Sequence, residues 1–314
     1  MLPSSPAQSS IGAASRMFAH RPVLLDEALA GLAVRPGGIY VDGTFGRGGH
    51  SGAILAALEG TGALHGFDRD PEAARHAAAE FGALPNFHFH NRNFADVGRV
   101  AAEIGMAGKV DGLLLDLGVS SPQFDDAARG FSFSHDGPLD MRMDPSSGES
   151  AAEWLARASD AAIADVLYEF GEERNSRRIA RKIVEARSVE PIRTTAQLAS
   201  LIASVPGPRS FKIHPATRSF QAIRIHVNGE LSALETALEA SIGLLAPGGR
   251  LAVISFHSLE DRIVKRFIRD HARDTDFVRA TLEPVGRQFP TDEEASANPR
   301  ARSAVLRVAE RLPS

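Results

Sequence analysis

A single stretch decides the fold of this chain: Ile39-Tyr40-Val41-Asp42-Gly43-Thr44-Phe45-Gly46-Arg47-Gly48-Gly49-His50. Three apolar residues lead into an acid, four glycines follow within seven positions, and the next residues, 50–58, are good helix formers. The order strand, glycine-rich turn, helix is typical of a nucleotide pocket, because glycine permits positive φ and close ligand approach, while the helix start offers unpaired N–H groups. The alternative is an ordinary turn between a strand and a helix, since a glycine fingerprint alone is weak.

The glycine spacing argues against two common nucleotide sites. A dinucleotide site needs glycine or alanine three residues after Gly48, where this chain has Ser51. A P-loop needs a Gly-Lys-Ser/Thr ending, which does not follow here. The pattern therefore favours a cofactor that contains an adenosine but no pyrophosphate.

Two acids at predicted strand ends suit such a cofactor. Asp42 ends the first strand, and Asp68 follows the next one, at residues 63–67. We expect Asp68 to accept hydrogen bonds from both ribose hydroxyls and Asp42 to serve the amino acid end of a methionine-bearing adenosine. Asp68 could instead cap a helix, but Asp70-Pro71-Glu72 is a better helix start, so we assign the cap to Asp70.

The composition sets limits on the protein. A chain of 314 residues that is 43% hydrophobic can form one large or two moderate domains with a substantial core. No apolar run approaches the ~18 residues that span a membrane. Residues 1–16 are small and polar and lack the features of a secretory signal, so we expect them to be disordered. The absence of cysteine excludes disulfides, thiolate metal sites and cysteine nucleophiles, and favours a cytoplasmic protein.

Strands and helices alternate in the first part of the chain, which predicts a parallel, doubly wound α/β sheet. Residues 110–116 are continuously apolar at their centre, as expected for a strand that is covered on both faces. The expected strands are 39–42, 63–67, 87–90 and 110–116, and the expected helices are 50–58, 71–81 and 95–104.

From about residue 125 to 215 only helical spacing of apolar residues is found. The sheet pattern resumes at 246–255, where a Pro-Gly-Gly turn leads into an apolar strand as it does before residue 39. Residues 125–215 are therefore predicted to be a helical insertion, carried on a sheet domain formed by 17–124 and 216–314, rather than a separate C-terminal domain. Within the latter range we expect a long helical stretch at roughly 217–245, a loop at 283–302 and a last strand near 303–309.

A second chemical feature follows the strand that ends at Asp116, where an open α/β sheet binds its ligands. Ser121-Pro122-Gln123-Phe124 resembles the Ser/Asn/Asp-Pro-Pro-aromatic motif of enzymes that methylate exocyclic amino groups of bases. An aryl amine is a poor nucleophile, so a polar side chain and a backbone carbonyl must accept its two N–H bonds to direct the lone pair. Ser121 would be the polar residue, and Phe124 would stack on an extruded base. Gln123 departs from the motif, and a plain loop is the alternative.

Other features of the sequence bear on the type of methylation, on substrate contact and on metal binding. Without a cysteine nucleophile the chain cannot form the covalent adduct that C5 methylation of a pyrimidine requires. His257, after the strand at 246–255, could contact substrate or be an ordinary loop histidine. No histidine and carboxylate spacing predicts a metal site.

The net charge of −4 does not by itself predict nucleic-acid binding, so such binding must come from a local patch. Residues 171–224 contain 11 lysines and arginines against four acids. A solvated, salt-bridged helix face is the usual explanation, but the excess of one sign favours phosphate contacts. Four arginines fall on one helix face: Arg174, Arg177, Arg178 and Arg181.

Nearly the whole chain carries long motifs that resemble the RsmH (MraW) family of methyltransferases. The motifs lie at residues 20–24, 42–50, 68–71, 114–123, 130–133, 137–144, 255–261 and 298–303. The resemblance implies a Rossmann-like class I methyltransferase sheet with a helical insertion that recognises substrate. It also implies S-adenosyl-L-methionine-dependent N4-methylation of a cytosine in the decoding region of 16S ribosomal RNA, in the cytoplasm and within the small ribosomal subunit.

The family's cofactor contacts fall on matching positions in this chain. In the glycine loop they are Gly48, Gly49 and His50. Asp68 would bind the ribose, Phe94 would lie beside the adenine, and Asp116 and Gln123 would complete the cofactor site. The resemblance thus makes Gln123 a family residue on the cofactor side of the site, and it leaves Ser121, Pro122, Phe124 and His257 as the candidates for the acceptor side.

Three other functions remain as alternatives. A DNA amino-methyltransferase would share the cofactor and the acceptor motif, and differs only in substrate. A non-catalytic RNA-binding assembly factor could retain the fold, but the intact glycine loop, Asp68 and Asp116 argue against loss of the cofactor. A nicotinamide oxidoreductase is disfavoured by Ser51. We expect ribosomal RNA, not DNA or a membrane, to be the partner.

Overall fold

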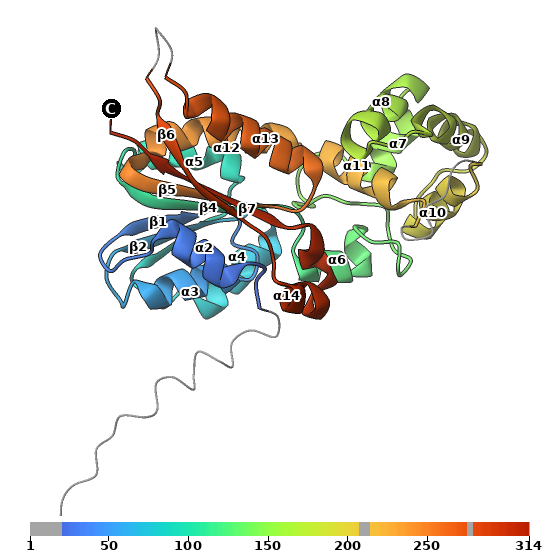
Figure 1. Cartoon of the computed structure of the whole chain (residues 1–314). Coiled ribbons are helices and arrows are strands. Elements are labelled where there is room, and N and C mark those ends of the chain that lie inside the picture. Colours follow the sequence, from blue (N-terminus) through green and yellow to red (C-terminus); the bar gives the residue numbers. More distant parts are fainter. Residues whose placement is uncertain (1–20, 207–213, 275–278, 314) are drawn as a thin grey trace, which may run out of the picture.

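The computed structural model describes residues 21–206, 214–274 and 279–313, so the segment predicted to be disordered, 1–16, lies outside it. Within the described residues, seven strands form one sheet in the order β3-β2-β1-β4-β5-β7-β6. The five strands β1 to β5 are parallel, and β7 runs antiparallel between β5 and β6 (Figure 1). The chain order reverses direction between β1 and β4, which is where an open α/β sheet binds its ligand.

The predicted parallel strands are confirmed, and their burial explains why the sequence shows them. β1 (Ile39–Asp42), β2 (Ala63–Phe67), β3 (Phe87–His90) and β4 (Val110–Asp116) have the predicted bounds, and β5 (Leu245–Ser255) starts one residue early. In β4, Leu113 and Leu115 face one apolar cluster while Leu114 faces another. Both faces of the strand are therefore covered, so its centre is apolar without alternation.

Helices cover the two faces of the sheet (Figure 1). One face packs on α5 (Val97–Glu103), α12 (Glu230–Leu244) and α13 (Ser258–His271). The other packs on α2 (Leu25–Leu32), α3 (Gly49–Ala57) and α4 (Pro71–Glu80). This is the predicted methyltransferase-type sheet, with every parallel strand connected by a helix that buries an apolar stripe.

The C-terminal part of the chain differs from the prediction in one place. The helical stretch expected at 217–245 is confirmed as two helices, α11 (Thr217–Asn228) and α12, separated by Gly229, whose φ is +62°. The loop expected at 283–302 is wrong: this range holds most of β6 (Leu282–Gln288), α14 (Asp292–Ala297) and η3 (Pro299–Ser303). The final strand, β7 (Val305–Arg311), is confirmed.

The helical layer lies at one end of the sheet domain (Figure 1). It contains α7 (Ala151–Arg157), α8 (Asp160–Gly171), α9 (Ser176–Val189) and α10 (Thr195–Ala203). Its apolar cluster runs from Phe131 to Ile223, so α11 also contributes to this core. The chain enters the layer through α6 (Ser121–Asp125) and η2 (Ala127–Arg129) and leaves it through α11. No helix among the described residues is long and apolar enough to cross a membrane.

Candidate active site

The end of β1 holds a buried acid that organises the glycine loop. Asp42 is 1% exposed, and its Oδ1 accepts a hydrogen bond from the Thr44 amide at 3.0 Å. The Ser51 hydroxyl donates to Asp42 Oδ2 at 2.7 Å from inside α3. Ser51 stands where a dinucleotide site has glycine, so the departure from that pattern gives the loop an internal anchor. Burial raises the pKa of Asp42, and these hydrogen bonds oppose the increase.

Different structural constraints explain the individual glycines of the loop. A Cβ at Gly48 would lie 2.5 Å from the Phe81 ring, and a Cβ at Gly49 would lie 2.4 Å from Pro22, so these two glycines are required for packing. A Cβ at Gly46 would meet nothing closer than Ser120 Cβ, at 3.9 Å. Gly46 therefore has room for a Cβ in ordinary van der Waals contact with the loop after β4, but its φ of +56° still favours glycine.

At the end of β2, the predicted capping role of Asp70 is confirmed, while ribose binding by Asp68 stays a prediction. Asp70 caps α4 by accepting the Glu72 amide at 2.9 Å. Asp68 accepts the amides of Gly46 and Asp70, each at 2.8 Å, with one carboxylate oxygen apiece. Each oxygen keeps a further lone pair for a ligand. Burial raises the pKa of Asp68 to about 6, despite the two backbone hydrogen bonds.

The next segment places Phe94 beside this edge. Asn91 Nδ2 donates to the Asp68 carbonyl at 2.8 Å, which holds residues 91–94 against the end of β2. A Cβ at Gly43 would be 3.2 Å from Phe94 Cβ, so the missing side chain at Gly43 lets the half-buried ring approach the end of β1.

Asp116, at the end of β4, faces His50 from α3. The Asp116 amide donates to the Thr44 hydroxyl at 2.6 Å, which fixes the strand end against the glycine loop. His50 Nδ1 lies 3.5 Å from Asp116 Oδ2, while His50 Nε2 and Asp116 Oδ1 are buried without any hydrogen-bond partner. Buried polar atoms without partners are rare, and here two of them lie at a strand end where a ligand is expected.

The acceptor loop is a short helix, α6, rather than an extended loop. Ser120 is its N-cap, and Ser121 and Pro122 are its first two residues. Gln123 is 8% exposed and uses both ends of its amide within the protein: Oε1 accepts the Ser120 amide at 3.0 Å and Nε2 donates to Asp70 Oδ2 at 2.6 Å. Gln123 therefore joins the loop after β4 to the loop after β2, and its predicted contact with the cofactor stays a prediction.

Phe124 has the exposure that a stacking residue needs, but one face is already covered. Its ring is 38% exposed, and the Arg300 guanidinium lies 4.7 Å from the ring centroid. Arg300 belongs to η3 and also pairs with Asp125. The sequence motif at 298–303 thus lies against α6, a contact that its distance along the chain conceals.

His257 is engaged in the start of α13. Its Nδ1 accepts the Glu260 amide at 3.4 Å, and Glu260 Oε2 accepts the amides of Phe256 at 2.8 Å and His257 at 3.2 Å. This is a capping box, which satisfies the orphan donors of a helix start. His257 Nε2 also lies 3.1 Å from Glu260 Oε1. Burial raises the pKa of Glu260, but the contacts with His257 and the charge of Arg224 outweigh it, so the net shift is downward.

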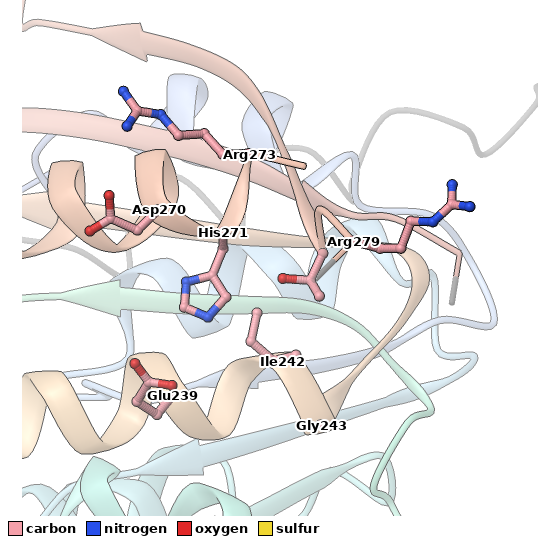
Figure 2. Close-up of a pocket in the computed structure, with 8 residues that line it drawn as sticks. Glu239, Ile242, Gly243, Asp270, His271, Arg273 and Arg279 are labelled. Carbon is pink, nitrogen blue, oxygen red and sulfur yellow. The ribbon is translucent and has the colours of Figure 1, made fainter. Parts of the chain in front are cut away.

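A separate cavity of about 480 Å³ lies elsewhere (Figure 2). It is bordered by the ends of α12 and α13 and by Thr281, near the start of β5 rather than its carboxyl end. Figure 2 shows the side chains of Arg273 and Arg279 directed away from His271 and Ile242. The two arginines therefore do not converge on the cavity. Across the described ranges, no three histidine or carboxylate side chains are placed to hold a metal ion.

The fold thus gathers most of the predicted residues at the carboxyl ends of β1, β2 and β4. The glycine loop, Asp68, Phe94 and Asp116 surround one edge, and the N-cap of α6 lies beside the glycine loop at Gly46. The arrangement fits an adenosyl amino acid: a carboxylate with free lone pairs suits a ribose, and unpartnered buried atoms suit a polar end.

This fold and site define a class I methyltransferase. The chain belongs to the MraW methylase family, whose model matches residues 17–312. It is 60% identical over 307 residues to "Ribosomal RNA small subunit methyltransferase H" of Thioalkalivibrio sulfidiphilus, covering 94% of this chain and 98% of that protein. A protein of the same description from Xanthomonas axonopodis pv. citri is 58% identical over 304 residues, covering 94% of this chain and 88% of that one.

Solved structures with a similar arrangement are remote in sequence. An rRNA methylase from Streptococcus thermophilus is 11% identical with a TM-score of 0.44, covering 94% of this chain and 99% of that chain. A putative methyltransferase from Streptococcus mutans in complex with SAH is 11% identical with a TM-score of 0.45, covering 94% and 100%.

Proposed function

We propose that this methyltransferase transfers the methyl group of S-adenosyl-L-methionine to N4 of a cytosine in the decoding region of 16S ribosomal RNA, in the cytoplasm and within the small ribosomal subunit. The observation that carries the proposal is that the N-cap of α6 lies next to the glycine loop, since a Cβ at Gly46 would be in van der Waals contact with Ser120 Cβ, at 3.9 Å. A methyl donor held by the glycine loop and an amino-group acceptor held by α6 would therefore be neighbours. The small-subunit rRNA methyltransferases at 58–60% identity support the same substrate class.

The cofactor would be held by the residues already described. S-adenosylmethionine, when bound, supplies a methyl group on a strongly electrophilic sulfonium. Asp68 accepts the ribose hydroxyls, Phe94 lies beside the adenine, and Asp116 with the glycine-loop backbone and His50 receives the methionine end. Gln123 would act through its hydrogen bonds to Asp70 and to the N-cap residue of α6, which fix the acceptor loop against the cofactor edge.

On the acceptor side, the chain orients the amino group. The Ser121 hydroxyl and a backbone carbonyl of the same loop accept its two N–H bonds, Pro122 limits the loop's freedom, and Phe124 stacks on the extruded base. The nitrogen lone pair would then point at the methyl group that the cofactor supplies, and the amine proton would be lost after transfer to water or to a neighbouring group. Orientation of this kind can lower a barrier by several kcal/mol, on the order of 7–11 in well-aligned systems.

The helical layer would bind the RNA backbone. Arg174, Arg177, Arg178 and Arg181 all lie on α9 or directly before it and are exposed, and only Arg178 among them makes a protein contact, to the Pro206 carbonyl at 3.3 Å, in the part of the chain that the structure describes. Arg209 and Lys212 of the predicted patch lie outside the described residues. We assign substrate recognition to the helical insertion. Its predicted end at residue 215 lies before α11, which packs in the same core.

Labelled methyl transfer tests the proposal against its alternatives. Assembled small subunits, deproteinised small-subunit rRNA and duplex DNA are each incubated with protein and methyl-labelled S-adenosylmethionine, and the nucleosides are then separated. We expect N4-methylcytidine from rRNA and no label in DNA. Label only in DNA, or a C5 or ribose methyl group, would overturn the proposal. Binding of rRNA without any transfer would favour the non-catalytic assembly factor.

A further inference from the structure

A buried carboxylate behind the cofactor edge collects donors from two parts of the chain. Asp70 is 3% exposed. Its Oδ2 accepts Gln123 Nε2 at 2.6 Å and Arg129 Nη1 at 2.9 Å, and its own amide donates to Asp68 Oδ1 at 2.8 Å. The backbone amide of Asp70 therefore connects Asp68, the predicted ribose-binding residue, to the buried ion pair between Asp70 and Arg129.

Arg129 extends this connection into the helical layer. The residue is 8% exposed, and its Nη2 donates to the carbonyls of Arg142 at 3.1 Å and Met143 at 2.8 Å, while Nη1 holds Asp70. The Arg129 carbonyl accepts the Met141 amide at 3.0 Å. Both the backbone and the side chain of Arg129 therefore bind the segment from Met141 to Met143. Met141 has a φ of +63° and is fully buried, which is a strained conformation for a residue other than glycine.

A second set of hydrogen bonds reaches the same loop from α11, through which the chain leaves the helical layer. Asn228, the last residue of α11, donates Nδ2 to the Met141 carbonyl at 2.7 Å and accepts the Met143 amide on Oδ1 at 2.8 Å. The Asn228 carbonyl in turn accepts Arg69 Nη1 at 2.9 Å, from the residue between Asp68 and Asp70. Both connections between the sheet and the helical layer are thus fixed to the three residues that follow β2.

We propose that Arg129 is a positioning residue that couples the ribose-binding edge at Asp68–Asp70 to the orientation of the helical layer, so that bound cofactor and bound RNA favour each other. The coupling follows from the fork geometry of the guanidinium, which satisfies a carboxylate with one nitrogen and two backbone carbonyls with the other. This inference rests on the proposed function only in naming RNA as the ligand of the helical layer.

The variant Arg129→Lys tests whether the coupling needs the hydrogen bonds of the guanidinium or only its positive charge. A lysine ammonium at this position keeps a cation beside Asp70, so the carboxylate is not left unpaired, but a compact charge cannot replace the planar fork. Arg142→Lys is the matched control. Arg142 forms the same kind of fork with Asp140, at 2.9 and 2.7 Å in the same loop, but makes no contact with Asp70.

Hydrogen exchange on the full-length protein, with and without S-adenosylhomocysteine and without RNA, measures the coupling directly. In the wild type and in Arg142→Lys, the product should slow exchange in residues 138–145 by about 5- to 150-fold, the usual range of coupling between sites. In Arg129→Lys the slowing in 138–145 should be lost, while the affinity for S-adenosylhomocysteine changes less than about threefold. No slowing in the wild type, equal slowing in Arg129→Lys, or equal loss in Arg142→Lys would each overturn the inference.

Two further measurements keep the result interpretable. If Arg129→Lys does not fold, Asn228→Ala replaces it: the product should still protect 138–145 through Arg129 but no longer protect 226–229, and loss of both would contradict the proposed path. Steady-state transfer to small-subunit rRNA should give Arg129→Lys a raised KM for rRNA with a nearly unchanged KM for cofactor. Wild-type protein that shows the exchange effect but never methylates rRNA would refute the proposed function and leave the coupling intact.

Discussion

The carboxyl group of Asp116 lies 3.5 Å from Nδ1 of His50, yet burial drives both groups toward their neutral forms. Burial lowers the pKa of His50 to about 4. Burial, with added repulsion from Asp42 and Glu260, raises the pKa of Asp116 well above its usual value. Burial therefore disfavours charge on both groups of this contact, and we expect the α-ammonium group of a bound cofactor to pair with Asp116.

The first prediction is that cofactor binding releases a proton from Asp116, because a nearby positive charge lowers the pKa of a carboxyl. Calorimetric titration with S-adenosylhomocysteine at pH 7, in buffers of different ionisation enthalpy, should report release of up to about one proton per site. Asp116→Asn should remove that dependence on buffer. The same buffer dependence in both proteins would assign the proton to another group.

The second prediction concerns Asp68, whose pKa of about 6 lies in an accessible range. The carboxylate form accepts the ribose hydroxyls, so the contribution of Asp68 to affinity should rise as pH increases through 6 and level off above 7, in addition to the pH dependence that proton release from Asp116 causes. At pH 5 only about a tenth of the Asp68 groups are ionised, so this contribution alone should make affinity about tenfold weaker than above pH 7. Calorimetry from pH 5 to 8 measures this, and Asp68→Asn should bind weakly without the inflection near 6. A wild-type profile that is flat between pH 5 and 7 would remove Asp68 from the ribose site.

The third prediction separates the roles of two loop glycines. Gly48→Ala would place a methyl group 2.5 Å from the Phe81 ring at a φ of +74°, so we expect a loss of about 2–4 kcal/mol in the free energy of unfolding. Gly46→Ala meets no close atom and should lose only about 1–2 kcal/mol, the penalty for its left-handed backbone. Its cofactor affinity should nevertheless fall more than that of Gly48→Ala, because its methyl group would project toward the loop after β4, where we place the methyl donor. Denaturant unfolding and calorimetry compare them, and equal stability losses would contradict the assignment.

The sequence predicts the parallel strands well because their burial on both faces leaves a local signal. The Asp70 cap was equally readable, since Asp-Pro-Glu is a local helix start and its chemistry needs no distant partner. β6 was missed for the opposite reason. It is an edge strand with one buried residue, Leu282, so it has no apolar alternation, and Pro284 is tolerated there because an edge strand can lack one ladder hydrogen bond.

The site residues divide in the same way. The pattern Ser120-x-x-Gln123 is a readable capping box, so both α6 and the engagement of Gln123 with the Ser120 amide could have been predicted. The pairing of Gln123 and Arg129 with Asp70 could not, because the partners are 53 and 59 residues away and only the closed sheet brings them together. The contact of Arg300 with Phe124 likewise depends on β7 returning between β5 and β6.

The fourth prediction is that His257 serves mainly as the N-cap of α13. Asparagine is a good N-cap, so His257→Asn should unfold within about 0.5 kcal/mol of the wild type, whereas His257→Ala should lose about 1 kcal/mol. If capping is its whole role, His257→Asn should also keep its rate of methyl transfer within about threefold, a change of less than 1 kcal/mol in the barrier. Thermal unfolding and steady-state transfer to rRNA test both points. A loss of rate of about a hundredfold or more in a stable His257→Asn protein would return this histidine to the catalytic residues.

The fifth prediction tests the arginines of α9 as phosphate contacts. Arg177→Glu with Arg178→Glu should weaken binding of small-subunit rRNA and reduce the slope of log affinity against log salt by about 1.4–1.8, since each lost phosphate contact removes ~0.7–0.9. The matched control is Arg266→Glu with Arg269→Glu, two exposed residues of α13 that give the same change in net charge. Filter binding at several salt concentrations measures the slope, and calorimetry should find cofactor affinity unchanged in both double variants. If the control lowers the slope as much as the α9 variant, the effect is one of net charge, and α9 is only a solvated face.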